Sequence, residues 1–397
     1  MDINQKALAL GSKRSIIREI FEYSKARAQE IGAENVFDFS LGNPSVEPPK
    51  EITETIKNLL DSKSPTFLHG YTSAQGDLFV RKTISDKINA SFNKKLSPDN
   101  IYMTCGAAAS LSISLKAVMN DGDECVVFAP FFTEYTVFIQ NAGGKVVVSN
   151  PEKSTFQIDI EDFERKITKN TKSVIINSPN NPSGVVYTRQ TIEQVCNILE
   201  QKQKEFNKDI YLIADEPYRE LIYDEVEVPY IMDYYKNSIV CYSFSKSLSL
   251  PGERIGYIAV NPEMNYSKEV CLAICGAGRS LGYVCAPSLF QQVVANCINA
   301  QVNVKAYREN RDLLYENLIK YGFTCIKPEG AFYLFVKSPD KDAFSFYERA
   351  KKHEILVVPC DDFGVQGFVR IAYCVDKKRI ENSLAKFKSL ANEYKLS

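Results

Sequence analysis

The sequence contains no tryptophan, only two histidines and almost no net charge. With only His69 and His353 available, a histidine-rich zinc site or a Ser-His-Asp triad is hard to assemble. The 48 Lys and Arg residues balance 49 Asp and Glu residues, which gives a formal net charge of -1. Such a balance creates no overall field that would attract nucleic acid or an anionic membrane. We therefore expect no metal site, no nucleic-acid partner and no membrane partner.

Long hydrophobic runs are also missing. The longest, such as Val126–Phe132, fall far short of the roughly 20 apolar residues that a membrane-spanning helix needs. Residues 1–15 lack the apolar core and small-residue cleavage site of a signal peptide. The 11 cysteines are odd in number and form no Cys-x-x-Cys pair, which favours reduced thiols over a disulfide framework. These features predict a cytoplasmic protein.

Between residues 101 and 260, apolar runs of strand length alternate with longer helical patterns. This alternation predicts an α/β fold, with a mostly parallel sheet flanked by helices in a large domain of residues 45–290. The expected helices are Ala107–Val118, Phe132–Ala142 and Thr191–Phe206. The expected strands are Ile101–Thr104, Glu124–Ala129, Lys145–Val148, Ser173–Asn177, Ile210–Ala214, Ser238–Phe244 and Ile255–Val260.

The pattern changes after Pro287, where a long helical stretch, Gln291–Lys320, precedes short strands and a terminal helix. An amphipathic helical segment also lies near Ile16 and Phe21. We therefore predict a smaller α+β domain formed by residues 1–44 and 291–397. Its expected strands are Ala331–Val336, Ile355–Val358 and Phe368–Ala372.

Polar clusters follow four of the predicted strands. Each cluster alone is typical of an ordinary turn or helix start. Because the carboxyl ends of parallel strands share one edge of a sheet, where ligands bind, the four together predict a single site. The clusters are Cys105–Ala108, Ser178–Gly184, Asp215–Tyr218 and Ser243–Lys246.

Several of these residues suit a phosphate beside a reactive amine. Gly106 opens a helix, so the backbone N–H groups of Gly106, Ala107 and Ala108 can bind a phosphate with the help of the helix dipole. Lys246 beside that phosphate is placed to form a Schiff base once its amine loses a proton. The other expected phosphate ligands are the hydroxyls of Ser243 and Ser245 and the guanidinium group of Arg254.

The run Ser243–Gly256, S-F-S-K-S-L-S-L-P-G-E-R-I-G, resembles the cofactor-attachment signature of the class I aminotransferases. These are the aspartate-aminotransferase-like members of the fold-type-I pyridoxal-phosphate enzymes. Asn181 in N-P-S-G, then Asp215 and Tyr218 in D-E-P-Y, follow in the family's order, and Arg370 in F-V-R-I matches its C-terminal arginine motif. The resemblance covers nearly the whole chain.

The resemblance implies roles around pyridoxal 5'-phosphate. Lys246 would hold the cofactor covalently and then move a proton at the substrate α-carbon. Asp215 would keep the pyridinium nitrogen protonated, so that the ring can accept electrons. Asn181 and Tyr218 would hydrogen-bond the ring oxygen, and Phe132 would stack on the ring.

The resemblance also implies how substrate and partner subunit are arranged. Arg370 would clamp the substrate α-carboxylate, with Gly42 in L-G-N-P and Asn181 beside it. Tyr71 would contact the neighbouring subunit's phosphate, which implies a homodimer with shared active sites. Arg279 lies roughly where dicarboxylate-using relatives bind the distal carboxylate, although a salt bridge is an equally good explanation.

The sequence therefore predicts an amino acid:2-oxo acid aminotransferase that works by a ping-pong mechanism, with aspartate and 2-oxoglutarate as one candidate pair. A carbon–sulfur β-lyase of the same fold would use the same lysine, aspartate and arginine, and it remains open as the alternative. A non-enzymatic regulator on this scaffold is disfavoured, because such proteins usually carry a basic DNA-binding domain.

Overall fold

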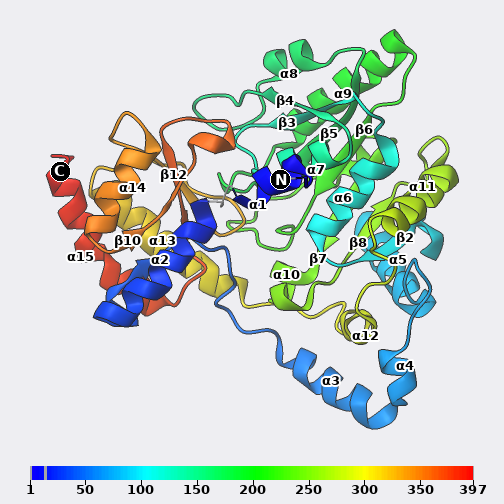
Figure 1. The fold of residues 1–397 in the computed structure, drawn as a ribbon, viewed down its shortest axis with the longest axis horizontal. Helices are drawn as coiled ribbons and strands as arrows, with labels where there is room; N and C mark the ends of the chain where they lie inside the picture. Colours follow the sequence, from blue (N-terminus) through cyan, green and yellow to red (C-terminus); the bar gives the residue numbers. More distant parts are fainter. Residues whose placement is uncertain (1, 13–15, 397) are drawn as a thin grey trace.

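The computed structural model describes residues 2–12 and 16–396, and it confirms the predicted α/β architecture (Figure 1). A seven-stranded sheet has the order β2-β8-β7-β6-β5-β3-β4. Strand β8 is antiparallel to both of its neighbours, whereas the other pairings are parallel. The strands are β2 (Ile101–Thr104), β3 (Glu124–Phe128), β4 (Lys145–Ser149), β5 (Thr171–Asn177), β6 (Tyr211–Asp215), β7 (Ser238–Ser243) and β8 (Gly256–Val260).

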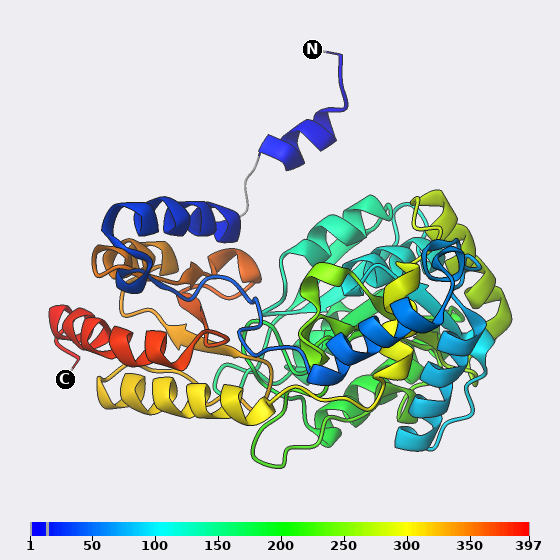
Figure 2. The ribbon, with the colours of Figure 1, turned by 90° about the horizontal axis from the view of Figure 1, so that it is seen from below.

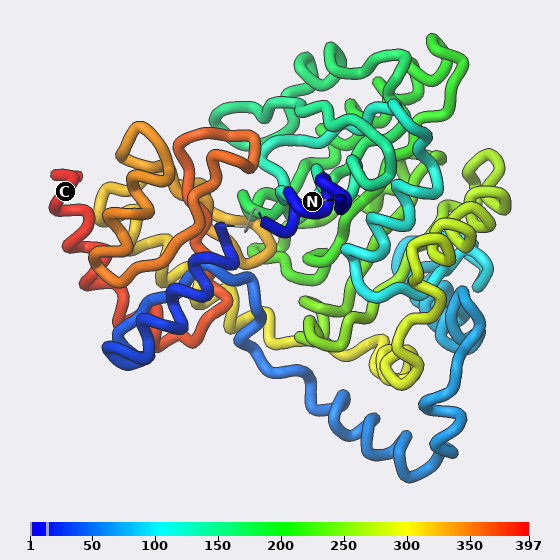
Figure 3. Tube along the Cα trace, in the orientation of Figure 1, coloured from blue at the N-terminus to red at the C-terminus, as the bar shows by residue number. Residues whose placement is uncertain are grey.

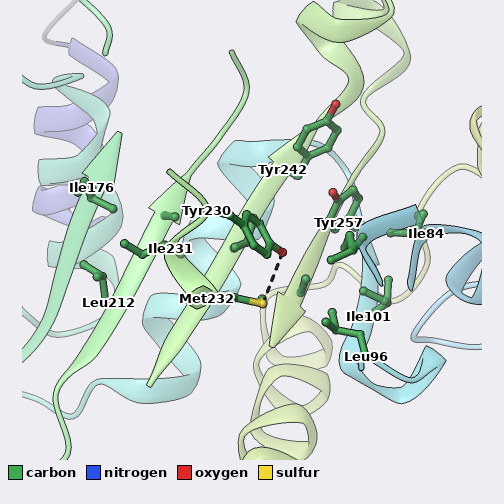
Figure 4. Close-up of a cluster of buried hydrophobic side chains, with 14 of the residues drawn as sticks. Ile84, Leu96, Ile101, Ile176, Leu212, Tyr230, Ile231, Met232, Tyr242 and Tyr257 are labelled. Carbon is green, nitrogen blue, oxygen red and sulfur yellow. Dashed lines mark hydrogen bonds between the residues drawn. The ribbon is translucent and has the colours of Figure 1, made fainter. Parts of the chain in front are cut away.

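Both faces of this sheet are buried, because alternate residues of each strand enter different hydrophobic clusters. On β3, Cys125 and Val127 belong to one cluster, while Val126 and Phe128 belong to the other. The first cluster is completed by α6 (Ala107–Val118), α7 (Glu134–Asn141) and α11 (Ser267–Ser280). The second, shown in part in Figure 4, is completed by α5 (Leu78–Phe92), α8 (Ile160–Lys166), α9 (Arg189–Phe206) and α12 (Ser288–Asn296).

Two smaller sheets lie apart from the large one, on the left in Figure 1. One has the order β11-β12-β9 and is antiparallel, and the other pairs β1 with β10 in parallel. Their strands are β1 (Phe37–Asp38), β9 (Tyr333–Lys337), β10 (Ile355–Leu356), β11 (Val358–Pro359) and β12 (Phe368–Ala372). The surrounding helices are α2 (Ile16–Ile31), α13 (Val304–Lys320), α14 (Ala343–Lys352) and α15 (Lys377–Glu393).

The N-terminal segment shares a core with these C-terminal elements. Ile20, Phe37 and Phe39 belong to the same hydrophobic cluster as Leu334 and Phe387. The tube in Figure 3 shows the blue N-terminal segment lying beside the orange and red C-terminal segments. Residues far apart in sequence are therefore joined by one buried cluster.

Two further helices lead from the smaller sheets to the large one. Helices α3 (Lys50–Ser62) and α4 (Pro65–His69) add Ile52, Leu59 and Leu68 to the second cluster. Helix α1 (Gln5–Ser12) buries no residue and stands away from the other elements in Figure 2. Within residues 2–12 and 16–396, no helix combines the length and apolar character required to cross a membrane.

Two expected elements are wrong. The single helix Gln291–Lys320 is divided into α12 and α13, because Asn303 caps a new helix start by accepting a hydrogen bond from the Ala306 amide at 3.3 Å. The single strand Ile355–Val358 changes partner, since β10 pairs with β1 whereas β11 pairs with β12.

We expect truncation of a sheet residue to destabilise the fold. Ile213 on β6 is fully buried, so Ile213→Ala should lower the free energy of unfolding by about 2–5 kcal/mol through lost contacts and a residual cavity. Ile319→Ala on α13, where the side chain is 42% exposed, is the matched control and should change it by less than about 0.5 kcal/mol. Urea unfolding followed by circular dichroism measures both, and equal losses would contradict this core assignment.

Candidate active site

The register of the sheet gathers the polar clusters at one edge. Asn177 at the end of β5 pairs with Asp215 at the end of β6. Gly256 at the start of β8 pairs with both Thr104 and Ser243, which end β2 and β7. Because β8 runs in the opposite direction, its beginning lies at the edge where its neighbours end. The polar residues that follow β2, β5, β6 and β7, and those that precede β8, therefore lie around one site.

A group of donors at this edge suits a phosphate. Gly106 caps α6 with a φ of 88°, which a side chain would disfavour. A Cβ atom there would also lie 2.9 Å from a guanidinium nitrogen of Arg254. Ala107 and Ala108 form the first turn of α6, whose amides have no partner within the helix. Backbone donors and a cation therefore face the same point.

Two serines belong to the same edge. The Ser243 hydroxyl caps α10 (Phe244–Ser247) by accepting a hydrogen bond from the Ser245 amide at 3.0 Å. This short helix also carries Lys246, so the hydroxyl groups and the amine are held on one turn.

Lys246 donates a hydrogen bond from Nζ to the Gly42 carbonyl oxygen at 2.7 Å, and the same atom lies 5.4 Å from the centroid of the Phe332 ring. Burial lowers the pKa of Lys246 to about 8, and the nearby cations Arg254 and Arg370 act in the same direction. The Cys374 thiol acts in the opposite direction. A substantial fraction of this amine is therefore uncharged near pH 8, as a nucleophile or base requires.

Asp215 ends β6 as a buried acid with one unused oxygen. Its Oδ2 accepts a hydrogen bond from the Tyr135 hydroxyl at 2.5 Å, whereas Oδ1 has no partner among the described residues. Burial raises the pKa of Asp215 to about 7. A cationic N–H donor placed against Oδ1 would favour the ionised form, as a protonated pyridine nitrogen would.

Arg370 on β12 is a buried cation that forms no ion pair with any described acidic residue. Its guanidinium group donates to Asn181 Oδ1 at 3.1 Å and to the Ser40 carbonyl oxygen at 2.7 Å, while Nε has no partner in the described chain. It also lies 4.5 Å from the centroid of the Tyr333 ring. Since a buried charge is costly without a counter-charge, this position favours a carboxylate ligand.

Asn181, Tyr218 and Phe132 lie beside these charged groups. The Asn181 side chain contacts Arg370, and the Tyr218 hydroxyl is 2.9 Å from the Tyr333 hydroxyl. Phe132 packs edge-on against Tyr135 with a centroid distance of 5.8 Å. Tyr135 therefore contacts both Phe132 and Asp215, the acid that would face a cofactor ring.

Two candidates remain outside this group. The Tyr71 side chain is 97% exposed, and Arg279 is exposed in the last turn of α11. In residues 2–12 and 16–396, neither side chain has a polar contact with the residues gathered at the sheet edge. The predicted contacts of Tyr71 and Arg279 therefore require a second subunit or a ligand.

Sequence analysis missed Tyr135, Tyr333 and Phe332. Tyr135 lies three residues after Phe132, so one turn of backbone places both on the same side, and this spacing could have revealed it. Tyr333 is more than a hundred residues from Tyr218, and no local pattern indicates that the two hydroxyls meet.

The donor set fits pyridoxal phosphate. The Gly106 loop and Arg254 suit its phosphate, the unused Oδ1 of Asp215 suits its ring nitrogen, and the Lys246 amine suits its aldehyde carbon. Arg370, which has no acidic partner among the described residues, suits a substrate carboxylate.

We expect the buried amine to reduce stability at neutral pH in protein freed of pyridoxal phosphate. Below pH 8 the folded state must bury a charged Lys246, so Lys246→Met should be more stable than wild type by about 3 kcal/mol. Between pH 8 and 10.5 the folded wild type has lost this proton but the unfolded chain has not, so wild type gains stability and the gap closes. Urea unfolding at several pH values measures the gap, and the exposed-lysine variant Lys305→Met should show none. A gap that persists above pH 10.5 would contradict the assignment.

A family model described as aminotransferase class I and II matches residues 34–387. A probable aspartate aminotransferase from Methanocaldococcus jannaschii is 31% identical over 389 residues, covering 95% of this chain and 97% of the relative. An aspartate aminotransferase from Thermotoga maritima is 30% identical, covering 93% and 95%.

Solved structures agree with these sequence matches. The crystal structure of an amino transferase from Eubacterium rectale superposes with a TM-score of 0.97 at 50% identity, covering 99% of both chains. The Thermus thermophilus aspartate aminotransferase with maleate gives 0.87 at 25% identity, covering 98% and 100%. The resemblance drawn from the sequence motifs is confirmed. The match of the family model and of these relatives over almost the full length shows that this chain belongs to the aminotransferase class I and II family.

Proposed function

We propose that this transaminase transfers amino groups between amino acids and 2-oxo acids by a ping-pong mechanism, with Lys246 as its acid–base group. One observation carries the proposal. The buried Lys246 amine is held 2.7 Å from the Gly42 carbonyl oxygen, close enough to Arg254 and Arg370 for both cations to act with burial in lowering its pKa to about 8. A base must be partly deprotonated at the working pH and must face the reacting carbon, and this position favours both.

The family implies pyridoxal phosphate, which when bound supplies an electron-accepting ring that stabilises negative charge on the substrate α-carbon. The Gly106, Ala107 and Ala108 amides, with Ser243, Ser245 and Arg254, would bind its phosphate. Asp215 would accept a hydrogen bond from the ring nitrogen through the Oδ1 atom that lacks a partner. Asn181 and Tyr218 would donate to the ring oxygen, and Phe132 would cover one face of the ring.

The substrate would be oriented by its α-carboxylate. Arg370 is fixed by hydrogen bonds to Asn181 and Ser40, so its remaining donors point in one direction and suit bidentate binding. Gly42 lies next to this group and accepts the Lys246 hydrogen bond. A substrate that displaces this bond would free the amine to take the proton from the substrate α-carbon and to hold it on Nζ until it is returned.

The proposed substrate class rests on a positive charge outside the residues gathered at the sheet edge. Relatives of this chain include aspartate aminotransferases and an aromatic-amino-acid aminotransferase. We infer aspartate and 2-oxoglutarate as the substrate pair, with Arg279 binding the distal carboxylate. The exposure of Arg279 is compatible with a role in a neighbouring subunit's site.

A homodimer with shared sites is part of the same proposal. An aromatic side chain that is 97% exposed, as Tyr71 is, costs hydrophobic free energy unless another surface covers it. In the dimer it would reach the partner's phosphate.

We also propose a division into a large domain of residues 45–290 and a small domain of residues 1–44 and 291–397, whose outermost limits at residues 1 and 397 lie outside the described residues. The eleven free cysteines fit the reducing cytoplasm.

The first test is the visible absorbance of the protein reconstituted with pyridoxal phosphate. Amino acids are added one at a time, followed by 2-oxoglutarate. We expect a band that bleaches with aspartate and returns with the oxo acid, because the amino group is stored on the enzyme between half-reactions. Lys246→Ala should lower the rate of bleaching at least about 100-fold, since it removes the acid–base group. Lys305→Ala, which changes an exposed lysine on α13, is the control.

Release of pyruvate from cysteine or cystathionine without amino transfer would instead establish the carbon–sulfur lyase.

The second test concerns specificity. Removing a charge-assisted contact costs about 1.5–3 kcal/mol, so Arg279→Ala should lower kcat/KM for aspartate by about 10- to 150-fold. The value for alanine, which has no distal carboxylate, should stay within twofold. Arg308→Ala, an exposed arginine on α13 that lies outside the gathered group, serves as the control. Unchanged aspartate turnover in Arg279→Ala would remove the argument for dicarboxylate specificity.

A further inference from the structure

Tyr333, the first residue of β9, contacts several parts of the site at once. It is 3% exposed, and its hydroxyl is 2.9 Å from the hydroxyl of Tyr218. Its ring supports the Arg370 guanidinium group at 4.5 Å. A Cβ atom on Gly42 would lie 2.1 Å from the Tyr333 hydroxyl, so this backbone approaches closely only because it is glycine.

We propose that Tyr333 is a positioning residue that aligns Tyr218 toward the cofactor ring oxygen and Arg370 toward the substrate carboxylate. This inference rests on the proposed function. It adds a residue that acts through two others, since Tyr333 would touch neither the reacting carbon nor the phosphate.

The direction of the Tyr218–Tyr333 hydrogen bond follows from counting protons. A phenol carries one proton. If Tyr218 donates its proton to the cofactor ring oxygen, it can only accept in the bond to Tyr333, so Tyr333 must be the donor. A donor to the Tyr218 oxygen polarises that phenol and strengthens the bond that Tyr218 donates. Tyr333 would thereby stabilise negative charge on the ring oxygen.

Tyr333 must keep its proton to act in this way. Burial raises the pKa of Tyr333 above that of an exposed phenol, while Arg370 acts in the opposite direction. The other titratable groups facing it are Tyr218 from the segment after β6 and Cys374 from the segment after β12. Lys246, on α10, approaches through Gly42. None of these groups removes the phenolic proton near neutral pH.

The ring has a separate effect on Arg370. An aromatic face holds a guanidinium group without neutralising it, whereas a carboxylate in the same place would compete with the substrate. The ring, Asn181 and Ser40 together fix the plane of the guanidinium group. Its charge and remaining N–H groups stay available to a carboxylate.

Two variants of Tyr333 distinguish the effect of its hydroxyl group from the effect of its aromatic ring. Tyr333→Phe removes only the donor, and Tyr333→Leu removes donor and ring. Tyr373→Phe is the matched control, because Tyr373 is also fully buried and its hydroxyl bonds the Ala331 carbonyl at 3.3 Å, outside the site. For each reconstituted protein, the pKa of the visible chromophore is measured by absorbance titration, and KM and kcat are measured for aspartate.

In Tyr333→Phe we expect the chromophore pKa to rise by roughly half to one pH unit, since the deprotonated form loses a stabilising hydrogen bond, with KM within twofold of wild type. In Tyr333→Leu the same rise should be joined by a KM increase of roughly 3- to 30-fold. A residue with a purely structural role would leave the chromophore pKa unchanged. Gly42→Ala, whose methyl group would displace the Tyr333 hydroxyl, should reproduce the pKa rise and serves as the hydroxyl test if Tyr333→Phe does not fold.

Two different failures can be distinguished. If wild type bleaches with amino acids but Tyr333→Phe titrates like wild type, the positioning role is wrong while the proposed function stands. If wild type itself shows no amino-acid-dependent change in its spectrum, the proposed function fails, and the inference fails with it.

Discussion

Desolvation of three ionisable groups governs this site. Asp215 ends β6 and Lys246 follows β7 at one edge of the large sheet, Arg370 lies near Lys246, and none of the three is paired with an opposite charge from the described chain. Burying a charge is unfavourable unless a partner compensates for the lost hydration, so a ligand of complementary charge would stabilise each group. Asp215 needs a cationic donor, Lys246 needs an electrophile or a proton acceptor, and Arg370 needs a carboxylate. Ligands that carry these complements would stabilise the folded protein as they bind.

The arrangement of strands makes this site possible. The parallel strands end at one edge, and the reversed direction of β8 brings Arg254 back to that edge. Arg370 comes from a different sheet, on β12, and its guanidinium group donates a hydrogen bond to Asn181, which follows β5 of the large sheet. The site therefore depends on contact between residues of two separate sheets.

The relatives show how one scaffold supports different substrates. Relatives named for aspartate and for aromatic amino acids match this chain at 31% and 27% identity over nearly its full length. A shared fold does not fix the substrate, because side-chain selection depends on residues at the mouth of the site. The proposed roles of Lys246, Asp215 and Arg370 would serve any amino acid, since all such substrates share the same α-amino and α-carboxylate groups.

The sequence by itself determined the fold class, the positions of most strands to within two residues and the family, because apolar runs of strand length and the motif around Lys246 are local features. It failed where the outcome depended on distant partners. The break between α12 and α13 and the change of partner at Leu356 were not visible locally. Only the tertiary structure showed that Tyr135 bonds Asp215 and that Tyr333 joins Tyr218 to Arg370. Hydrogen bonds and charge burial depend on which segments meet in space, and a linear pattern carries no record of those distances.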